Sequence, residues 1–284
     1  MATHPNMRRD VNEAKSTARG AATSQPVVWL ARLGYAAKGV VYLIIGGLAI
    51  KLATGFGGSA TDQQGALQAI HNEPLGKFLL IIVAIGLIGY ALIKFVAALF
   101  DTDRAGKDAK GALTRVGDAV VGVIYAALAL GAIQLATSGK AAKGSNASAQ
   151  DWTATLLSHS LGVVLVVIIG LIVLAIAGFL FYRAYAADFR KQLNLTGLGA
   201  RFSTWAILSG RLGYAALGVV EAIVGIFLII AAVQHNASQA KGLSGALQVL
   251  IHQPFGPVLL AIVALGLIAY GIFSFVQARY RRMV

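Results

Sequence analysis

The sequence predicts an all-α integral membrane protein with six transmembrane helices, arranged as three tandem helical hairpins around a pseudo-threefold axis. Three observations predict this fold class. Hydrophobic residues make up 57% of the chain and charged residues only 12%, which is roughly half the charged fraction of a soluble domain. The apolar residues gather in six long segments. The hexapeptide RLGYAA occurs at 32–37 and again at 211–216, which indicates an internal repeat.

Six apolar segments approach or exceed the ~20 residues that a helix needs to cross the hydrocarbon layer. They span residues 27–53, 78–100, 116–136, 161–182, 205–233 and 257–276. Residues 1–26 are polar and lack the apolar core and small-residue cleavage site of a signal peptide. We therefore expect the first apolar helix to act as its own insertion signal.

The basic residues are distributed unevenly between the two sides of the predicted bundle. One side, which includes both termini, holds 19 of the 24 Lys and Arg residues, and the other holds Lys51, Lys77, Lys140, Lys143 and Lys241. Basic residues stay on the cytoplasmic side, so we expect a protein of the bacterial cytoplasmic membrane with both termini in the cytoplasm. The net charge of +13 comes from short flanks of helices, not from a basic module with interleaved aromatics, so no nucleic-acid partner is expected.

The chain offers no set of residues for catalysis or metal binding. It has no cysteine, which excludes disulfides, thiolate metal sites and cysteine nucleophiles. His71, His159 and His252 recur near the start of each second helix, but their registers differ by a residue or two, which argues against a threefold metal site. We find no nucleophile, base and acid together, and we expect no enzymatic activity, no metal and no cofactor.

The first helix of each hairpin opens with a shared pattern. RLGYAAKGVVY, RVGDAVVGVIY and RLGYAALGVVE have Arg, then Gly two residues on, then Gly seven residues on. The resulting repeat signature comprises Arg32, Gly34, Gly39, Arg115, Gly117, Gly122, Arg211, Gly213 and Gly218. The second helices match too, since 65–90 mirrors 245–270 without a gap, but the middle copy needs a two-residue shift to bring Gly170 onto Gly86.

The repeats divide the chain into a polar tail and three units. The predicted boundaries are 1–27 for the cytoplasmic tail, 28–101 for the first repeat, 110–187 for the divergent second repeat and 203–284 for the third. The pattern resembles DUF1206, a bacterial family of integral membrane proteins of unknown function. The similarity rests on RLGYAAKGVVY, on GALQ followed by PLGKFLLIIVAIGLIGYAL, and on their second appearance in the third repeat, and it covers residues 28 to 280. It implies membrane location and threefold repetition, and no catalytic residues.

Each hairpin has a loop on the side opposite the termini, at 54–75, 137–160 and 234–254. Stretches such as GALQAI and GALQVLI within these loops are amphipathic. We predict that they form short helices lying in the membrane interface. Trp152 suits an anchor in this interface, and Trp29 and Trp205 suit the aromatic belt at the cytoplasmic ends of their helices.

Nearly all polar atoms of the three first helices lie on one helical face. In the first repeat this face reads Arg32, Tyr35, Gly39, Tyr42 and Gly46. Polar groups in lipid are costly and turn toward protein or water, and small residues allow helices to approach closely. We therefore expect the three first helices to gather around the axis, with the second helices outside them.

Glu221 is the most unusual residue, because it lies about halfway along the fifth transmembrane helix. Its counterparts in the other repeats are Tyr42 and Tyr125. Lys38 is its expected partner, and Asp118 and Lys94 lie at similar depth. One interpretation is a proton or cation site that titrates with transport. The favoured interpretation is structural: Glu221 is protonated and bonded to the tyrosines, or paired with Lys38.

Two function classes follow from these features. The first is a non-enzymatic accessory, scaffold or lipid-binding module, whose partners are membrane lipids and other membrane-protein subunits. The alternative is a small-solute or proton-coupled ion transporter that uses the site near Glu221. Beyond Glu221 the axial face contains small and apolar residues, among them Ala49, Ala132 and Leu228, and this dry segment favours the first class.

Overall fold

The computed structural model describes residues 25–100, 109–196 and 199–282, so most of the predicted 1–27 tail lies outside the described residues. Within them, six helices are long and apolar enough to cross a membrane. They are α2 (Gln25–Ala53), α4 (Gly76–Phe100), α5 (Ala109–Ser138), α7 (Gly162–Ala186), α8 (Ala200–Val233) and α10 (Gly256–Tyr280). The predicted all-α fold with six transmembrane helices is confirmed.

Shorter helices occupy the three loops at the end of the bundle where the hairpins turn. These are α3 (Gln63–His71), α6 (Ser145–Leu157) and α9 (Leu243–Ile251), accompanied by the 3₁₀ turn η2 (Ala237–Gln239). A second 3₁₀ turn, η1 (Asp188–Gln192), follows α7. We call the end formed by α3, α6 and α9 the loop-helix end, and the opposite end, where α2 begins and α10 ends, the basic end. The predicted short helices are therefore present in all three loops.

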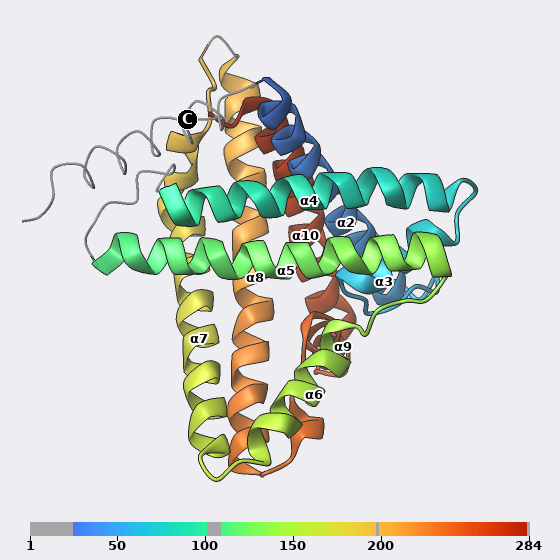
Figure 1. The fold of residues 1–284 in the computed structure, drawn as a ribbon, viewed down its shortest axis with the longest axis vertical. Coiled ribbons are helices and arrows are strands. Elements are labelled where there is room, and N and C mark those ends of the chain that lie inside the picture. The colour runs from blue at the N-terminus through green and yellow to red at the C-terminus, as the bar shows by residue number, and fades with distance from the viewer. Residues whose placement is uncertain (1–24, 101–108, 197–198, 283–284) are drawn as a thin grey trace, which may run out of the picture.

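The long helices pack as three antiparallel pairs, each of which joins two different repeats. α2 lies against α10, α4 against α5, and α7 against α8. Figure 1 shows the α4–α5 pair crossing in front of the α7–α8 pair. The expectation that the second helices lie outside the first helices is wrong: α2, α5 and α8 each pack mainly against a second helix of another repeat.

Glycine explains why the pairs form between repeats. The second glycine of each repeat signature receives a phenylalanine ring from the paired helix. The contacts join Gly39 to Phe275, Gly122 to Phe95, and Gly218 to Phe181, and a Cβ atom placed on each glycine would lie 2.8, 2.9 and 3.1 Å from the ring. Each phenylalanine lies 19 residues after the glycine that begins its helix (95 − 76, 181 − 162, 275 − 256). At this contact the middle repeat therefore aligns with the others without a shift.

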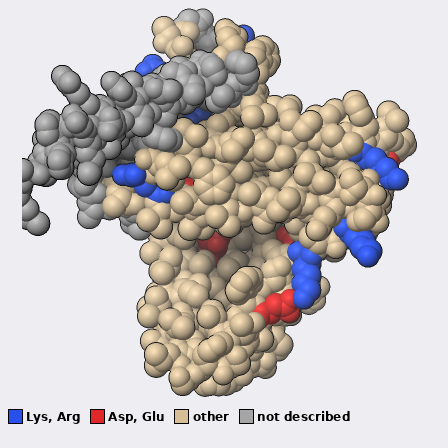
Figure 2. Space-filling model, in the orientation of Figure 1, with Lys and Arg blue, Asp and Glu red and all other residues tan. Residues whose placement is uncertain are grey.

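The outer surface of the bundle is apolar along the helices. Figure 2 shows an uncharged face over the α4–α5 pair, with basic side chains near its ends. α7 is the least buried of the six spans and also has the highest mean hydropathy, 3.3. Such a surface is stable against lipid chains, so this chain is a multi-pass membrane protein.

Candidate functional site

The ammonium group of Lys38 lies in a cage of tyrosines at the centre of the bundle. Lys38 is only 6% exposed. Its Nζ donates to the hydroxyl of Tyr270 at 2.5 Å and to that of Tyr90 at 3.3 Å. It also lies 4.5, 5.1 and 5.9 Å from the ring centres of Tyr270, Tyr90 and Tyr125. Hydroxyl acceptors and electron-rich ring faces are groups that stabilise the protonated form of an amine.

The expected pairing of Lys38 with Glu221 is not present. Neither residue takes part in any of the ion pairs of the described residues. The physical reason is that α4 and α10, predicted to lie outside, come close to the axis and supply Tyr90 and Tyr270 to Lys38. The lysine therefore has phenols as its partners where a carboxylate was predicted.

Glu221 lies in the neighbourhood of its counterpart Tyr42 from the first repeat. Tyr42 in turn lies within hydrogen-bonding reach of Tyr125, its counterpart in the middle repeat. The side chain of Gln63, at the start of α3, donates to the hydroxyl of Tyr42 at 3.4 Å. The three equivalent positions thus converge, as expected of residues around a pseudo-threefold axis.

Asp118 and Lys94 form an ion pair separate from the lysine cage. Their side chains lie 2.6 Å apart across the α4–α5 pair, and each is 12% exposed. The residues equivalent to Lys94 are Leu180 and Ser274, 18 residues after the glycine that begins each second helix. This ion pair therefore has no equivalent in the other two helix pairs. The predicted polar cluster therefore has two parts: the Lys94–Asp118 pair, and a group in which ring contacts of Tyr42 and Tyr125 join the Lys38 cage to the neighbourhood of Glu221.

Beyond Glu221, toward the loop-helix end, the interior is packed with small side chains. Ala49, Ala129 and Ala132 are buried there. On this face the first helices carry small and apolar residues. Polar groups from α3 reach it from the loop-helix end, since the Gln63 amide contacts the Tyr42 hydroxyl and the Gln64 amide lies against Gly131.

Asp62 links the three short helices of the loop-helix end, and its role was not predicted from the sequence. This buried carboxylate accepts from the backbone N–H of Gly65 at 3.0 Å, from the backbone N–H of Ser145, and from the hydroxyl of Ser244 at 3.5 Å. The three donors belong to the N-terminal segments of α3, α6 and α9, where helix dipoles favour a negative charge. The sequence contains only a weak indication of this role. Asp is a common N-cap residue, and Asp62 stands three residues before Gly65, but this spacing predicts a cap for one helix only.

The signature arginines lie at the basic end, where they contact carbonyls or aromatic rings. Arg115 donates to the carbonyl oxygens of Ala98 at 2.7 Å and Leu99 at 3.2 Å, near the end of α4. Arg211 donates to the carbonyl oxygen of Tyr185 at 3.2 Å, near the end of α7. Arg32 stacks on Trp29, 5.4 Å from its ring. In two repeats the arginine therefore caps the last turn of the paired helix.

The middle repeat differs from the other two because its own helices hardly touch. α2 packs on α4 and α8 packs on α10, whereas α5 and α7 make at most marginal contact. A Cβ atom on Gly34 would lie 2.8 Å from the backbone nitrogen of Tyr90, and one on Gly213 would lie 2.9 Å from that of Tyr270. The equivalent Gly117 has no such neighbour within 4 Å. The helical hairpin of the middle repeat is thus open.

Exposure of equivalent positions confirms this opening. Ile124 is 54% exposed, whereas its counterparts Val41 and Val220 are 1% and 2% exposed. The positions that meet in the two closed hairpins are held here by exposed apolar residues, which we call the open middle face: Val116, Val120 and Ile124 of α5 and Ile172, Ile176 and Phe179 of α7. Figure 2 shows a recess below the α4–α5 pair, over the region of α8, with acidic atoms inside it.

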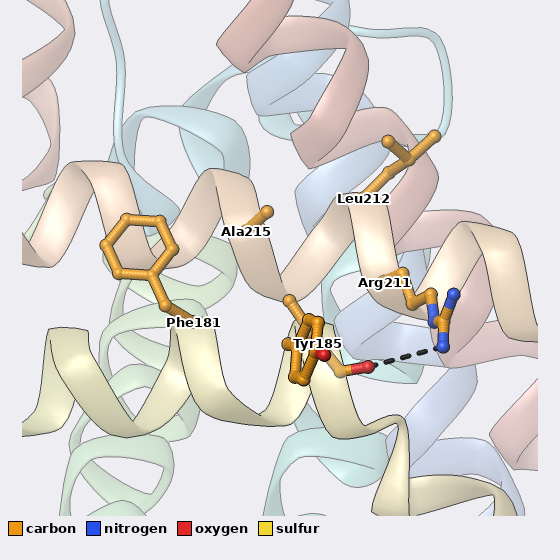
Figure 3. Close-up of a pocket in the computed structure, with 6 residues that line it drawn as sticks. Phe181, Tyr185, Arg211, Leu212 and Ala215 are labelled. Carbon is orange, nitrogen blue, oxygen red and sulfur yellow. Dashed lines mark hydrogen bonds between the residues drawn. The ribbon is translucent and has the colours of Figure 1, made fainter.

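A shallow pocket lies on the other side of α7, between α7 and α8 (Figure 3). Its volume is about 650 Å³ and it is lined by Phe181, Ala184, Tyr185, Arg211, Leu212 and Ala215. Figure 3 shows the guanidinium of Arg211 directed to the backbone oxygen of Tyr185. The pocket is open and mostly apolar, with one cation that already has a partner. No group of three or more potential metal ligands occurs in the part of the chain that the structure describes.

Comparisons with known proteins agree with the threefold architecture. The family DUF1206, a Domain of Unknown Function, matches residues 33–101, 116–187 and 212–281. The chain is 32% identical to the "Uncharacterized protein YxxB" of Bacillus subtilis (strain 168) over 252 residues, which is 89% of this chain and 90% of that protein. No solved structure matches.

Proposed function

Because this chain belongs to DUF1206, a family of unknown function, its role has to come from its geometry, and we propose that it is a non-enzymatic membrane protein that binds lipid at the open middle face. The observation behind this proposal is the separation of α5 and α7 in the only repeat whose hairpin does not close. The distribution of basic residues favours the bacterial cytoplasmic membrane, with both termini in the cytoplasm.

The side chains of the open middle face favour lipid over a partner helix. Where the first repeat has Ala37, Gly86 and Tyr90 in close contact, the middle repeat has Val120, Ile172 and Ile176. Helix interfaces in membranes are rich in small residues that let backbones approach. Branched aliphatic side chains prevent that approach and offer a surface that suits acyl chains. A scaffold role would need another face for its partner subunits.

A transporter is the second candidate, and Glu221 with its two tyrosines is the feature in its favour. Two features weigh against it. Buried alanines fill the axis beyond Glu221, and Asp62 joins the three helices of the loop-helix end. Lipid binding needs no route through the axis, so it fits the packing better.

The test compares two tryptophan variants of adjacent residues on α7. Ile172 and Leu171 are both 54% exposed, but helical geometry turns them about 100° apart, and only Ile172 faces α5. The full chain, extracted in mild detergent, is analysed for retained phospholipid by mass spectrometry. We expect Ile172→Trp to fill the gap and lower the amount of retained lipid, and Leu171→Trp to leave it unchanged.

Equal retention in wild type, Ile172→Trp and Leu171→Trp would contradict the proposal, because lipid would then coat the protein without using the gap. Absence of retained lipid in the wild type would contradict it as well. In either case, a proton or cation flux in reconstituted vesicles that Glu221→Gln abolishes would support the transporter.

A further inference from the structure

We propose that the open middle face binds an anionic phospholipid whose phosphate lies on Arg183 and whose acyl chain lies between α5 and α7. This inference rests on the proposed function and specifies the lipid class. It comes from a stripe of residues along α7 that ends in a single arginine.

The stripe is defined by helical spacing. Residues 165, 169, 172, 176, 179 and 183 alternate at intervals of four and three, which places them on one face of a helix. The first five are Leu165, Ile169, Ile172, Ile176 and Phe179, and all five are exposed. Arg183 ends the stripe in the last turn of α7. The apolar stripe therefore ends at a single cation, Arg183, at the basic end.

The length of this stripe matches the thickness of one leaflet of a bilayer. From Arg183 back to Ile172 the helix rises about 16 Å, at about 1.5 Å per residue. The hydrocarbon of one leaflet is about 15 Å thick. A phospholipid with its phosphate at Arg183 would therefore lay one acyl chain along Phe179, Ile176 and Ile172, the residues that face the gap.

The charge around Arg183 favours an anion. Arg183 shares the basic end with the signature residues Arg115 and Arg211, which contact the last turns of α4 and α7. Asp118 is paired with Lys94 at 2.6 Å and so does not offset these arginines. The charge at the basic end is thus positive. If this end faces the cytoplasm, it meets the leaflet surface that carries anionic lipids.

The guanidinium of Arg183 is arranged to receive a phosphate. It stacks on two rings, at 4.5 Å from that of Tyr214 and 5.9 Å from that of Phe179. Stacking occupies the planar face and leaves the N–H edge, which matches phosphate oxygens in a two-point contact. Arg183 takes part in none of the ion pairs among the described residues.

The experiment measures lipid binding to the full chain by native mass spectrometry, with phosphatidylglycerol as the anionic probe and phosphatidylcholine as the zwitterionic one. We expect the wild type to bind phosphatidylglycerol roughly tenfold more tightly, a difference of about 1.4 kcal/mol. Arg183→Gln and Arg183→Met should both abolish this preference. Arg211→Gln is the matched control, because Arg211 lies at the same end but lines the pocket on the other side of α7.

Three results would overturn the inference. Equal binding of the two lipids by the wild type would remove the headgroup assignment, while the loss of retained lipid in Ile172→Trp could still support the proposed function. An equal effect of Arg183→Gln and Arg211→Gln would indicate general attraction to a basic surface. Full displacement of phosphatidylglycerol by millimolar inorganic phosphate would indicate a site for a free anion, in which the acyl chain has no part.

Discussion

Lys94 on α4 and Asp118 on α5 form a salt bridge of 2.6 Å inside the membrane-spanning part of the α4–α5 pair. Removing one partner of a buried pair leaves the other charge uncompensated, which costs about 3–5 kcal/mol. Asp118→Asn should therefore lower the free energy of unfolding by about that amount. Adding Lys94→Met should recover much of the loss, because both charges are then gone. Unfolding in detergent measures both effects.

An exposed ion pair provides the control for this cycle. Lys143 and Asp151 also form a salt bridge, but both side chains are exposed. Surface pairs contribute about 0–1 kcal/mol, so Asp151→Asn should have little effect. A loss in Asp151→Asn as large as in Asp118→Asn would contradict the distinction between the two pairs.

The contacts of the second signature glycines give a second prediction. Gly39→Leu, Gly122→Leu and Gly218→Leu each place a side chain against a phenylalanine ring of the paired helix. Overpacking typically costs about 1–3 kcal/mol, so all three variants should melt at lower temperature. Gly117→Leu is the control, since no atom of a neighbouring element lies within 4 Å of an added Cβ, and it should not destabilise the protein. Neutral behaviour of the first three variants would mean that these glycines face lipid.

Asp62 gives a third prediction, at the loop-helix end. Asp62→Ala removes the acceptor for the N–H groups of Gly65 and Ser145 and for the hydroxyl of Ser244. Loss of an N-cap alone costs about 0.5–2 kcal/mol, and Asp62 serves more than one helix, so we expect the upper part of that range or more. Hydrogen exchange should show faster exchange in α3, α6 and α9 together. Faster exchange confined to α3 would show that Asp62 caps one helix only.

Glu221 gives a fourth prediction. Glu221 takes part in none of the ion pairs of the described residues, and Lys38 is held by Tyr270 and Tyr90. Glu221→Gln keeps the side-chain volume and can still hydrogen-bond, so the melting temperature should change little. Lys38→Met alone should lower the melting temperature clearly more, because it removes the hydrogen bonds to Tyr270 and Tyr90. Losses of equal size in the two single variants would support the predicted Lys38–Glu221 pair.

Local patterns were enough to predict the helices of this fold. Runs of apolar residues defined the six spans, and the amphipathic stretches of the loops corresponded to α3 and α9. The contacts between helices could not be predicted in the same way. A glycine such as Gly39 indicates that something packs closely, but it does not say whether a first helix or Phe275 fills the space.

The polar residues were found from the sequence, but most of their partners were not. Lys38 and Glu221 stood out because charge is costly inside a membrane. The tyrosines around Lys38 come from α4 and α10, and only the pairing of repeats brings them to the axis. The divergence of the middle repeat was visible in the sequence as the shift of Gly170. The sequence did not show what this divergence does. In the structure the hairpin of the middle repeat is open, and Ile172 occupies the position that Gly86 has in the first repeat.

The separation of α5 and α7 is tested most directly by cysteine cross-linking in lipid bilayers, because the chain has no cysteine of its own. A Cβ atom on Gly86 would lie 2.8 Å from that of Ala37, so a shift of about 1 Å between α2 and α4 brings the pair to the separation of about 3.5–4.5 Å in a disulfide. Ala37→Cys with Gly86→Cys should therefore oxidise to a disulfide, as should the equivalent pair in the third repeat, Ala216→Cys with Gly266→Cys. The account predicts that Val120→Cys with Ile172→Cys stays reduced under the same conditions, and rapid, complete cross-linking of this middle pair would contradict it.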